Sequence, residues 1–222
     1  GWLRADIHDW TGLWHCAPGG WPHMPGHGHQ DCGAFELHYG GEAVFIDAGR
    51  GAYGEAGEAA RYRAAGVHNT LTIDDADPYP ANRPYYDDAF RRAIGGPPPV
   101  LERRDDIITL RHGGYGRLSG GGDVLRTWSL KPGGLGIIDQ VGGGGRHRIR
   151  RNLVTALAVT LEGGEAVISG RNHTFRVSGD VRPEISTITV WQAYGQGVPA
   201  TSICFDASAT LPWQGHINVS VV

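Results

Sequence analysis

The stretch GHGHQDCGAFELHYGGEAVFIDAGRGAY, residues 26–53, contains the clearest β-hairpin signal in this chain. Residues 34–39 have the composition of a strand, Gly40-Gly41 is a typical two-residue turn, and residues 42–47 are expected to return as the second strand. A second stretch, RAAGVHNTLTID at residues 63–74, predicts a further strand that begins directly after His68. The sequence therefore predicts a hairpin that ends at Asp47 and a third strand preceded by a histidine.

Four polar residues at the ends of these strands predict a metal site. His27 and His29 are two residues apart, and side chains at i and i+2 of an extended chain point the same way. Asp47 ends the hairpin and His68 opens the next strand. Imidazole and carboxylate ligands in this combination suit zinc. We therefore expect at least three of these four residues to share one site.

The remainder of the chain has the pattern of short strands and tight turns. The sequence of 222 residues contains 36 glycines, and from residue 100 onward glycine-rich turns separate strand-like runs at near-regular spacing. This pattern predicts an all-β fold, a large antiparallel β-sandwich of several sheets with very little helix. We expect one domain over residues 1–222, any helix near residues 55–65, and a surface excursion at 78–99 rather than a domain linker.

Composition excludes several classes of partner. The chain has 20 Lys and Arg against 23 Asp and Glu, a net charge of −3, which gives no reason to expect binding to nucleic acid or to an anionic membrane surface. It contains no apolar run of the length that crosses a bilayer. The three cysteines, Cys16, Cys32 and Cys204, are widely spaced, so we expect buried thiols and leave one disulfide open.

Several other residues near the predicted site allow two interpretations each. Asp31 is expected either to orient a ligand histidine or to form a turn. Tyr53 either donates a proton or contacts a sugar, or it packs on the sheet. Arg61 and Arg63 either bind an anionic group or pair with nearby glutamates. The early tryptophans favour core packing over a carbohydrate platform; they are Trp2, Trp10, Trp14 and Trp21.

Five segments together resemble the C-terminal β-sheet domain of the heparinase II/III-like family of polysaccharide lyases. The segments are Gly26-His-Gly-His-Gln-Asp31, Phe35-Glu-Leu37, Phe45-Ile-Asp-Ala-Gly49, Tyr53-Gly54 and Val67-His-Asn-Thr70. The resemblance is specific over residues 20–75 and general elsewhere, although Tyr194-Gly195 followed by two strands also fits it.

The resemblance implies a fold, an activity and a set of site residues. The fold is a β-sandwich that follows an α-helical toroid, with the substrate cleft between the two. The activity is β-elimination on a uronic-acid-containing polysaccharide, which would be the anionic partner of this chain. The resemblance implies a zinc ion held by His29, Asp47 and His68, with His27 and Tyr53 as catalytic residues. We expect the toroid to be absent from this chain, which then carries only part of an active site.

The sequence departs from the family pattern after the histidine pair, where Gln30-Asp-Cys-Gly33 replaces the usual small residues. Two alternatives stay open at this point. One is a non-catalytic carbohydrate-binding or accessory sandwich with structural zinc. The other is a cupin-type metalloenzyme, although Glu36 lies seven residues after His29, further than the cupin pattern places its glutamate. The polysaccharide substrate leads us to expect a periplasmic or extracellular location.

Overall fold

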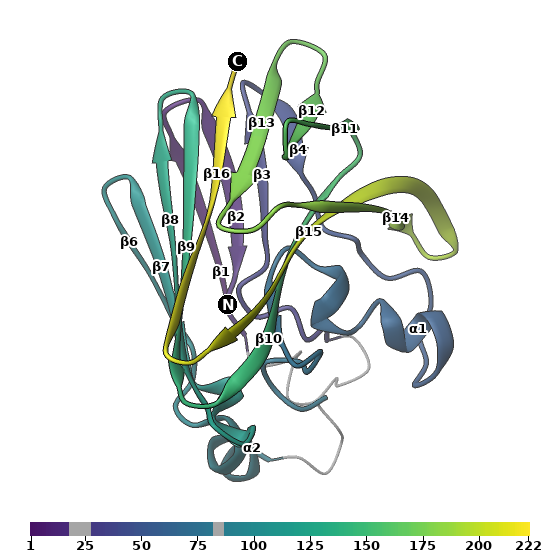
Figure 1. The fold of residues 1–222 in the computed structure, drawn as a ribbon. Coiled ribbons are helices and arrows are strands. Elements are labelled where there is room, and N and C mark those ends of the chain that lie inside the picture. The colour runs from purple at the N-terminus through teal and green to yellow at the C-terminus, as the bar shows by residue number, and fades with distance from the viewer. Residues whose placement is uncertain (18–27, 82–86) are drawn as a thin grey trace.

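The fold was described from a computed structural model that covers residues 1–17, 28–81 and 87–222 (Figure 1). Among the described residues strands make up 57% and helices 9%, and the strands form three antiparallel sheets. The predicted all-β antiparallel sandwich with very little helix is therefore confirmed.

The first sheet contains the predicted hairpin. Its strand order is β1-β2-β3-β4, with bounds Trp2–Ile7, Trp10–His15, Phe35–Tyr39 and Glu42–Phe45. Gly40 and Gly41 close the β3–β4 hairpin with φ angles of 55° and 83°, the positive values that a tight type I′ turn requires at both central residues. After β4 the chain continues to β10, where the Ile46 amide donates to the Val154 carbonyl at 3.0 Å.

The second sheet has eight strands in the order β11-β12-β13-β16-β9-β8-β7-β6. Their bounds are Ala158–Glu162, Glu165–Ser169, Thr174–Gly179, Trp213–Val221, Gly134–Gly143, Gly121–Lys131, Ile107–His112 and Val100–Arg104. The third sheet has the order β14-β15-β10-β5, with bounds Glu184–Ala193, Gln196–Thr210, Arg146–Thr155 and Leu71–Ile73. The short strand β5 is thereby placed at the sheet edge, directly after the segment that carries His68.

The main hydrophobic core lies between the first sheet and the eight-stranded sheet. Trp10 and Trp14 of the first sheet are fully buried with Trp128 and Phe175 of the second. Core packing is therefore confirmed for two of the early tryptophans. Trp2 is instead exposed, and Trp21 lies outside the described residues.

In the part of the chain that the structure describes, short helices interrupt the strands at four places. Helix α1 (Gly57–Arg61) and the 3₁₀ turn η2 (Ala65–Val67) lie in or next to the predicted region. The expectation of no helix outside 55–65 is wrong, because α2 (Asp88–Gly95) and η3 (Gly114–Arg117) also form. Helix α2 begins after Asp87, whose carboxylate accepts from the Phe90 amide at 2.7 Å. This N-cap supplies a start signal that the proline-rich flanks obscure in the sequence.

The state of the cysteines and the character of the helices complete the description of the fold. The three cysteines are buried and carry free thiols. Across the described ranges, none of the helices has the length and apolar character needed to cross a bilayer.

Candidate metal centre

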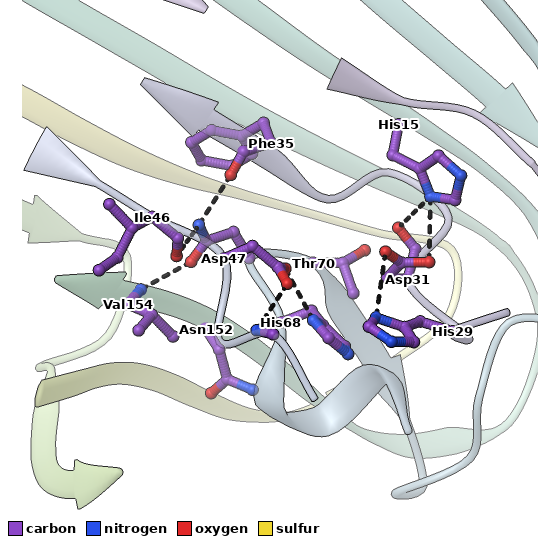
Figure 2. Close-up of polar contacts among 12 residues, drawn as sticks. His15, His29, Asp31, Phe35, Ile46, Asp47, His68, Thr70, Asn152 and Val154 are labelled. Carbon is purple, nitrogen blue, oxygen red and sulfur yellow. Dashed lines mark hydrogen bonds and ion pairs between the residues drawn. The ribbon is translucent and has the colours of Figure 1, made fainter. Parts of the chain in front are cut away.

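The segment that carries His68 is fixed by the side chain that follows it. The Asn69 amide nitrogen donates to the carbonyls of Phe35 at 2.7 Å and Ile46 at 3.0 Å. Its amide oxygen accepts from the Val154 backbone at 2.6 Å (Figure 2). One buried side chain therefore joins the start of β3, the end of β4 and the end of β10. His68, which is itself fully buried, has little freedom to move.

Further hydrogen bonds hold the segments on either side of His68. The Thr70 hydroxyl donates to the Cys32 carbonyl at 2.8 Å, which connects this segment to the one that follows His29. The Asn152 amide donates to the Gly66 carbonyl at 2.6 Å and fixes η2 on β10. The two histidine-bearing segments are thus joined to each other and to the sheets before any metal is considered.

Asp47 and His68 are in direct contact. Asp47 Oδ2 lies 2.7 Å from His68 Nδ1, and Asp47 Oδ1 accepts from the Gly49 amide at 2.8 Å (Figure 2). The other ring nitrogen of His68, Nε2, is buried and has no hydrogen-bond partner among the described residues. A buried polar atom in this condition is costly unless a ligand satisfies it.

A second carboxylate approaches the same histidine from the opposite side. His29, Asp31 and His68 each offer one ligand atom, and these atoms all lie within 4.8 Å of one another. The rings of His29 and His68 stack with centroids 5.0 Å apart, and His29 Nδ1 lies 4.0 Å from Asp31 Oδ2. Asp31 Oδ1 forms an ion pair with His15 Nδ1 at 3.0 Å (Figure 2).

Two opposing effects set the pKa values in the cluster: burial favours the neutral form of each group, and contact with an oppositely charged neighbour favours the charged form. Burial alone would lower the pKa of His68, but the charge and hydrogen bond of Asp47 outweigh it and raise that pKa to about 9. Burial and the neighbouring charge of His68 lower the pKa of His29. Burial opposes ionisation of Asp31, yet the hydrogen bond and charge of His15, with the other imidazoles, hold its pKa well below the usual range. The pKa of Asp47 is likewise lowered, because His68 outweighs its burial.

The donor set fits a divalent metal such as zinc. Two imidazoles and two carboxylates, both carboxylates held ionised, lie around His68. His29 and Asp31 offer ligand atoms within 4.8 Å of that of His68, and Asp47 contacts Nδ1 of the same ring, whose Nε2 is unsatisfied. Zinc takes nitrogen and carboxylate oxygen ligands in four-coordinate sites. A histidine ligand commonly directs its second nitrogen to a carboxylate, which is the position that Asp47 occupies against His68.

The structure treats the predicted site residues differently. It brings His29 and His68 together and places Asp47 on Nδ1 of His68, so Asp47 as a third metal ligand stays a prediction. Asp31 lies among the possible ligand atoms, which the sequence left undecided. His27 lies outside the described residues. Tyr53 is not in this cluster; it stands at the surface, 59% exposed.

One neighbour of the site, His15, was not predicted from the sequence. His15 reaches Asp31 only because β2 pairs with the segment that precedes β3, and its amide donates to the Ala34 carbonyl at 2.8 Å. No local signal in the sequence reports that pairing. For Arg63 the glutamate interpretation is supported, since Nη1 lies 2.7 Å from Glu55 Oε1.

Comparison with known proteins agrees with this fold. The heparinase II/III-like C-terminal family matches residues 1–216. A structure of heparinase III aligns with a TM-score of 0.71 at 15% identity, over 100% of this chain and 34% of that one. Heparan sulfate lyase HepC from Pedobacter heparinus aligns with a TM-score of 0.68 at 16% identity, over 96% of this chain and 33% of that one. A search of curated protein sequences gave no match.

Identities this low demonstrate a shared fold alone, and the chain spans about a third of the length of these two structures. The family match is independent of them and covers nearly the whole sequence. The chain therefore belongs to the heparinase II/III-like family, whose C-terminal domain it forms.

Proposed function

We propose that this chain is the β-sandwich part of a zinc-containing polysaccharide lyase that cleaves a uronic-acid-containing polysaccharide by β-elimination. The observation that carries the proposal is that His29 stacks on His68 and Asp47 contacts the same His68, in a chain of this family. The similar structures named as heparinase III and heparan sulfate lyase support an acidic polysaccharide as the substrate class.

The reaction defines what the protein must supply. A base removes the proton at C5 of the uronate, a neighbouring group neutralises the carboxylate so that this proton becomes acidic, and an acid protonates the departing O4. When bound, zinc supplies a fixed positive charge and a common anchor for the loops around it. Elimination needs no hydroxide nucleophile, so an anchoring role agrees with this chemistry better than water activation.

Residues of this chain can be assigned parts in that scheme. Asp47 orients His68 through Nδ1, and the lowered pKa of His29 favours the neutral imidazole that a metal ligand must provide. The loop that begins at Asp47 continues to Tyr53, so the anchor controls where this tyrosine stands. We assign His27 and Tyr53 to proton transfer in the cleft, with the α-helical toroid as the other wall.

The experiment compares the 222-residue chain with the full-length protein that carries it. The expected result is one zinc per chain in both proteins. Unsaturated oligosaccharides, detected by ultraviolet absorbance, should form only with the full-length protein, on heparan sulfate or on alginate. His29→Ala should remove zinc from both, whereas His216→Ala, an exposed histidine on β16, should leave zinc and activity unchanged.

Two outcomes would change the proposal. A full-length protein that binds zinc and polysaccharide but releases no unsaturated product would favour the accessory carbohydrate-binding alternative. Vigorous release by the 222-residue chain alone would show that the proton-transfer groups are all present in it. The family match sets the cupin alternative aside.

A further inference from the structure

Two exposed tyrosines from distant parts of the chain lie side by side. Tyr53 follows Asp47 in the loop after β4, and Tyr194 lies in the turn between β14 and β15. Their ring centroids are 5.9 Å apart with an interplanar angle of 34°. Tyr53 is 59% exposed and Tyr194 is 69% exposed, so neither ring contributes to the hydrophobic core.

The two supporting segments are fixed to each other by backbone hydrogen bonds. The Gly195 amide donates to the Gly51 carbonyl at 2.8 Å, and the Trp191 amide donates to the Ala48 carbonyl at 2.8 Å. A Cβ at Gly51 would lie 2.2 Å from the Trp191 ring, so the loop approaches the indole as closely as only glycine allows. In Figure 1 this hairpin end lies on the same side of the molecule as α1.

A cation completes the group. The Arg50 guanidinium carbon lies 5.2 Å from the centroid of the Tyr53 ring, and Nη2 donates to the Gly54 carbonyl at 3.0 Å. The three side chains Arg50, Tyr53 and Tyr194 therefore present two aromatic faces and one positive charge at one surface position. We call this group the tyrosine platform.

Its chemistry matches one unit of an acidic polysaccharide. The C–H face of a pyranose packs on an aromatic ring, and the tyrosine hydroxyls offer hydrogen bonds to sugar hydroxyls. The carboxylate of a uronate is the group that an arginine binds with charge-assisted hydrogen bonds. A neutral sugar would use the rings but not the guanidinium.

We propose that Arg50, Tyr53 and Tyr194 form a subsite that binds one uronate unit of the polysaccharide. Tyr194 is the residue that this adds, since it binds the sugar ring beside Tyr53 and belongs to a hairpin far along the chain. The inference rests on the proposed function for its substrate class. Its geometry stands on the contacts above.

The test is a calorimetric titration of the 222-residue chain with tetrasaccharides. The probes are a heparan sulfate tetrasaccharide, an alginate tetrasaccharide and the carboxyl-reduced form of each. Tyr194→Ala should weaken binding of the acidic probe about three- to tenfold, the effect of removing one aromatic contact. Tyr194→Phe keeps the ring and should stay close to the unaltered chain. Leu161→Ala removes an exposed apolar side chain on β11 and should change nothing.

Arg50→Gln separates charge from stacking. It should weaken binding of the acidic tetrasaccharide and leave the carboxyl-reduced form unchanged. Since the 222-residue chain is used, a role of Tyr194 in contact with other parts of the full-length protein cannot imitate the expected result.

The proposal is overturned if the unaltered chain binds neither acidic probe, or if Tyr194→Ala binds as tightly as the unaltered chain. These outcomes differ from failure of the proposed function. If the full-length protein shows no lyase activity but binding still depends on Tyr194, the proposed reaction is refuted and the subsite stands. If the full-length protein is an active lyase but binding does not depend on Tyr194, the subsite is refuted and the proposed reaction stands.

Discussion

Asp47 and His68 are 21 residues apart in sequence and are joined by a contact of 2.7 Å between Oδ2 and Nδ1. In a neutral imidazole this contact places the proton on Nδ1 and leaves the buried Nε2 as an electron-pair donor. The contact therefore prepares His68 as a ligand. It also raises the question of which carboxylate completes the metal shell, because Asp31 lies on the other side of the same ring system.

Substitution of the two carboxylates distinguishes their roles. If Asp47 is the metal ligand, Asp47→Asn should weaken zinc binding by far more than Asp31→Asn. A carboxylate that only orients a ligand costs about 10- to 100-fold when it is removed. Titration against a competing chelator measures both affinities. The opposite order would make Asp31 the ligand and Asp47 the residue that orients His68.

The histidines should separate in the same way. His68→Ala should abolish zinc binding and loosen residues 48–67, because Asp47 and the loop after it then lose their anchor. His27→Ala should retain zinc and impair only catalysis in the full-length protein. Metal analysis with hydrogen exchange over the loop gives both readouts, and His216→Ala serves as the control. A chain that needs His27 for zinc but not His68 would refute the ligand assignment.

A buried ion pair contacts the segment that carries His68, through the backbone of Asn69. Arg126 Nε and Asp139 Oδ1 lie 3.2 Å apart with both side chains almost fully buried, and Arg126 Nη1 donates to the Asn69 carbonyl at 3.3 Å. Asp139→Asn leaves the guanidinium without its counter-charge and should lower the free energy of unfolding by about 3–5 kcal/mol. Glu102→Gln, which removes one partner of an exposed pair, should cost about 1 kcal/mol or less. Urea unfolding at pH 7 compares them, and equal costs would contradict the argument.

One histidine outside the site should make stability depend on pH. Burial, with a smaller contribution from the charge of Arg126, lowers the pKa of His112 to about 4. The unfolded chain, with a histidine pKa near 6.5, binds more protons than the folded chain between these values. Stability contributed by neutral His112 is therefore complete above about pH 6.5 and is lost as pH falls toward 4.

The measurement is unfolding free energy at pH 7 and pH 5 for the unaltered chain and for His112→Gln. The unaltered chain should lose up to about 2 kcal/mol more than the variant over this interval. The comparison between the two chains cancels the contribution of His68, whose raised pKa acts in the opposite direction. Identical pH dependence would mean that His112 is not held neutral by the fold.

Local features of the fold were predictable, and long-range ones were not. The β3–β4 hairpin follows from Gly40 and Gly41, whose positive φ angles are those the turn requires. Helix α2 was missed because its start depends on one cap, at Asp87, within a proline-rich segment. The sheet order places β16 between β9 and β13, and no periodicity in the sequence reports such a neighbour.

The candidate site shows the same division. His29, Asp47 and His68 could be named from motif spacing and family resemblance, because each lies at the end of a predicted strand. The contacts of His15 with Asp31 and of Tyr194 with Tyr53 could not be named, since each forms through pairing between distant segments. The spacing of residues in the sequence predicts which side chains one hairpin can bring together, whereas these two contacts form only when the sheets have assembled.

The hydrogen bonds of Asn69 have a consequence for the order of folding. Its partners lie on segments 34 residues before it and 85 residues after it, so its bonds close only when β3, β4 and β10 have come together. Contacts with such long loops form late on average, because chain closure must precede them. We therefore expect a metal ion to meet its ligands after the sandwich has closed. We expect zinc to slow unfolding while leaving the refolding rate nearly unchanged.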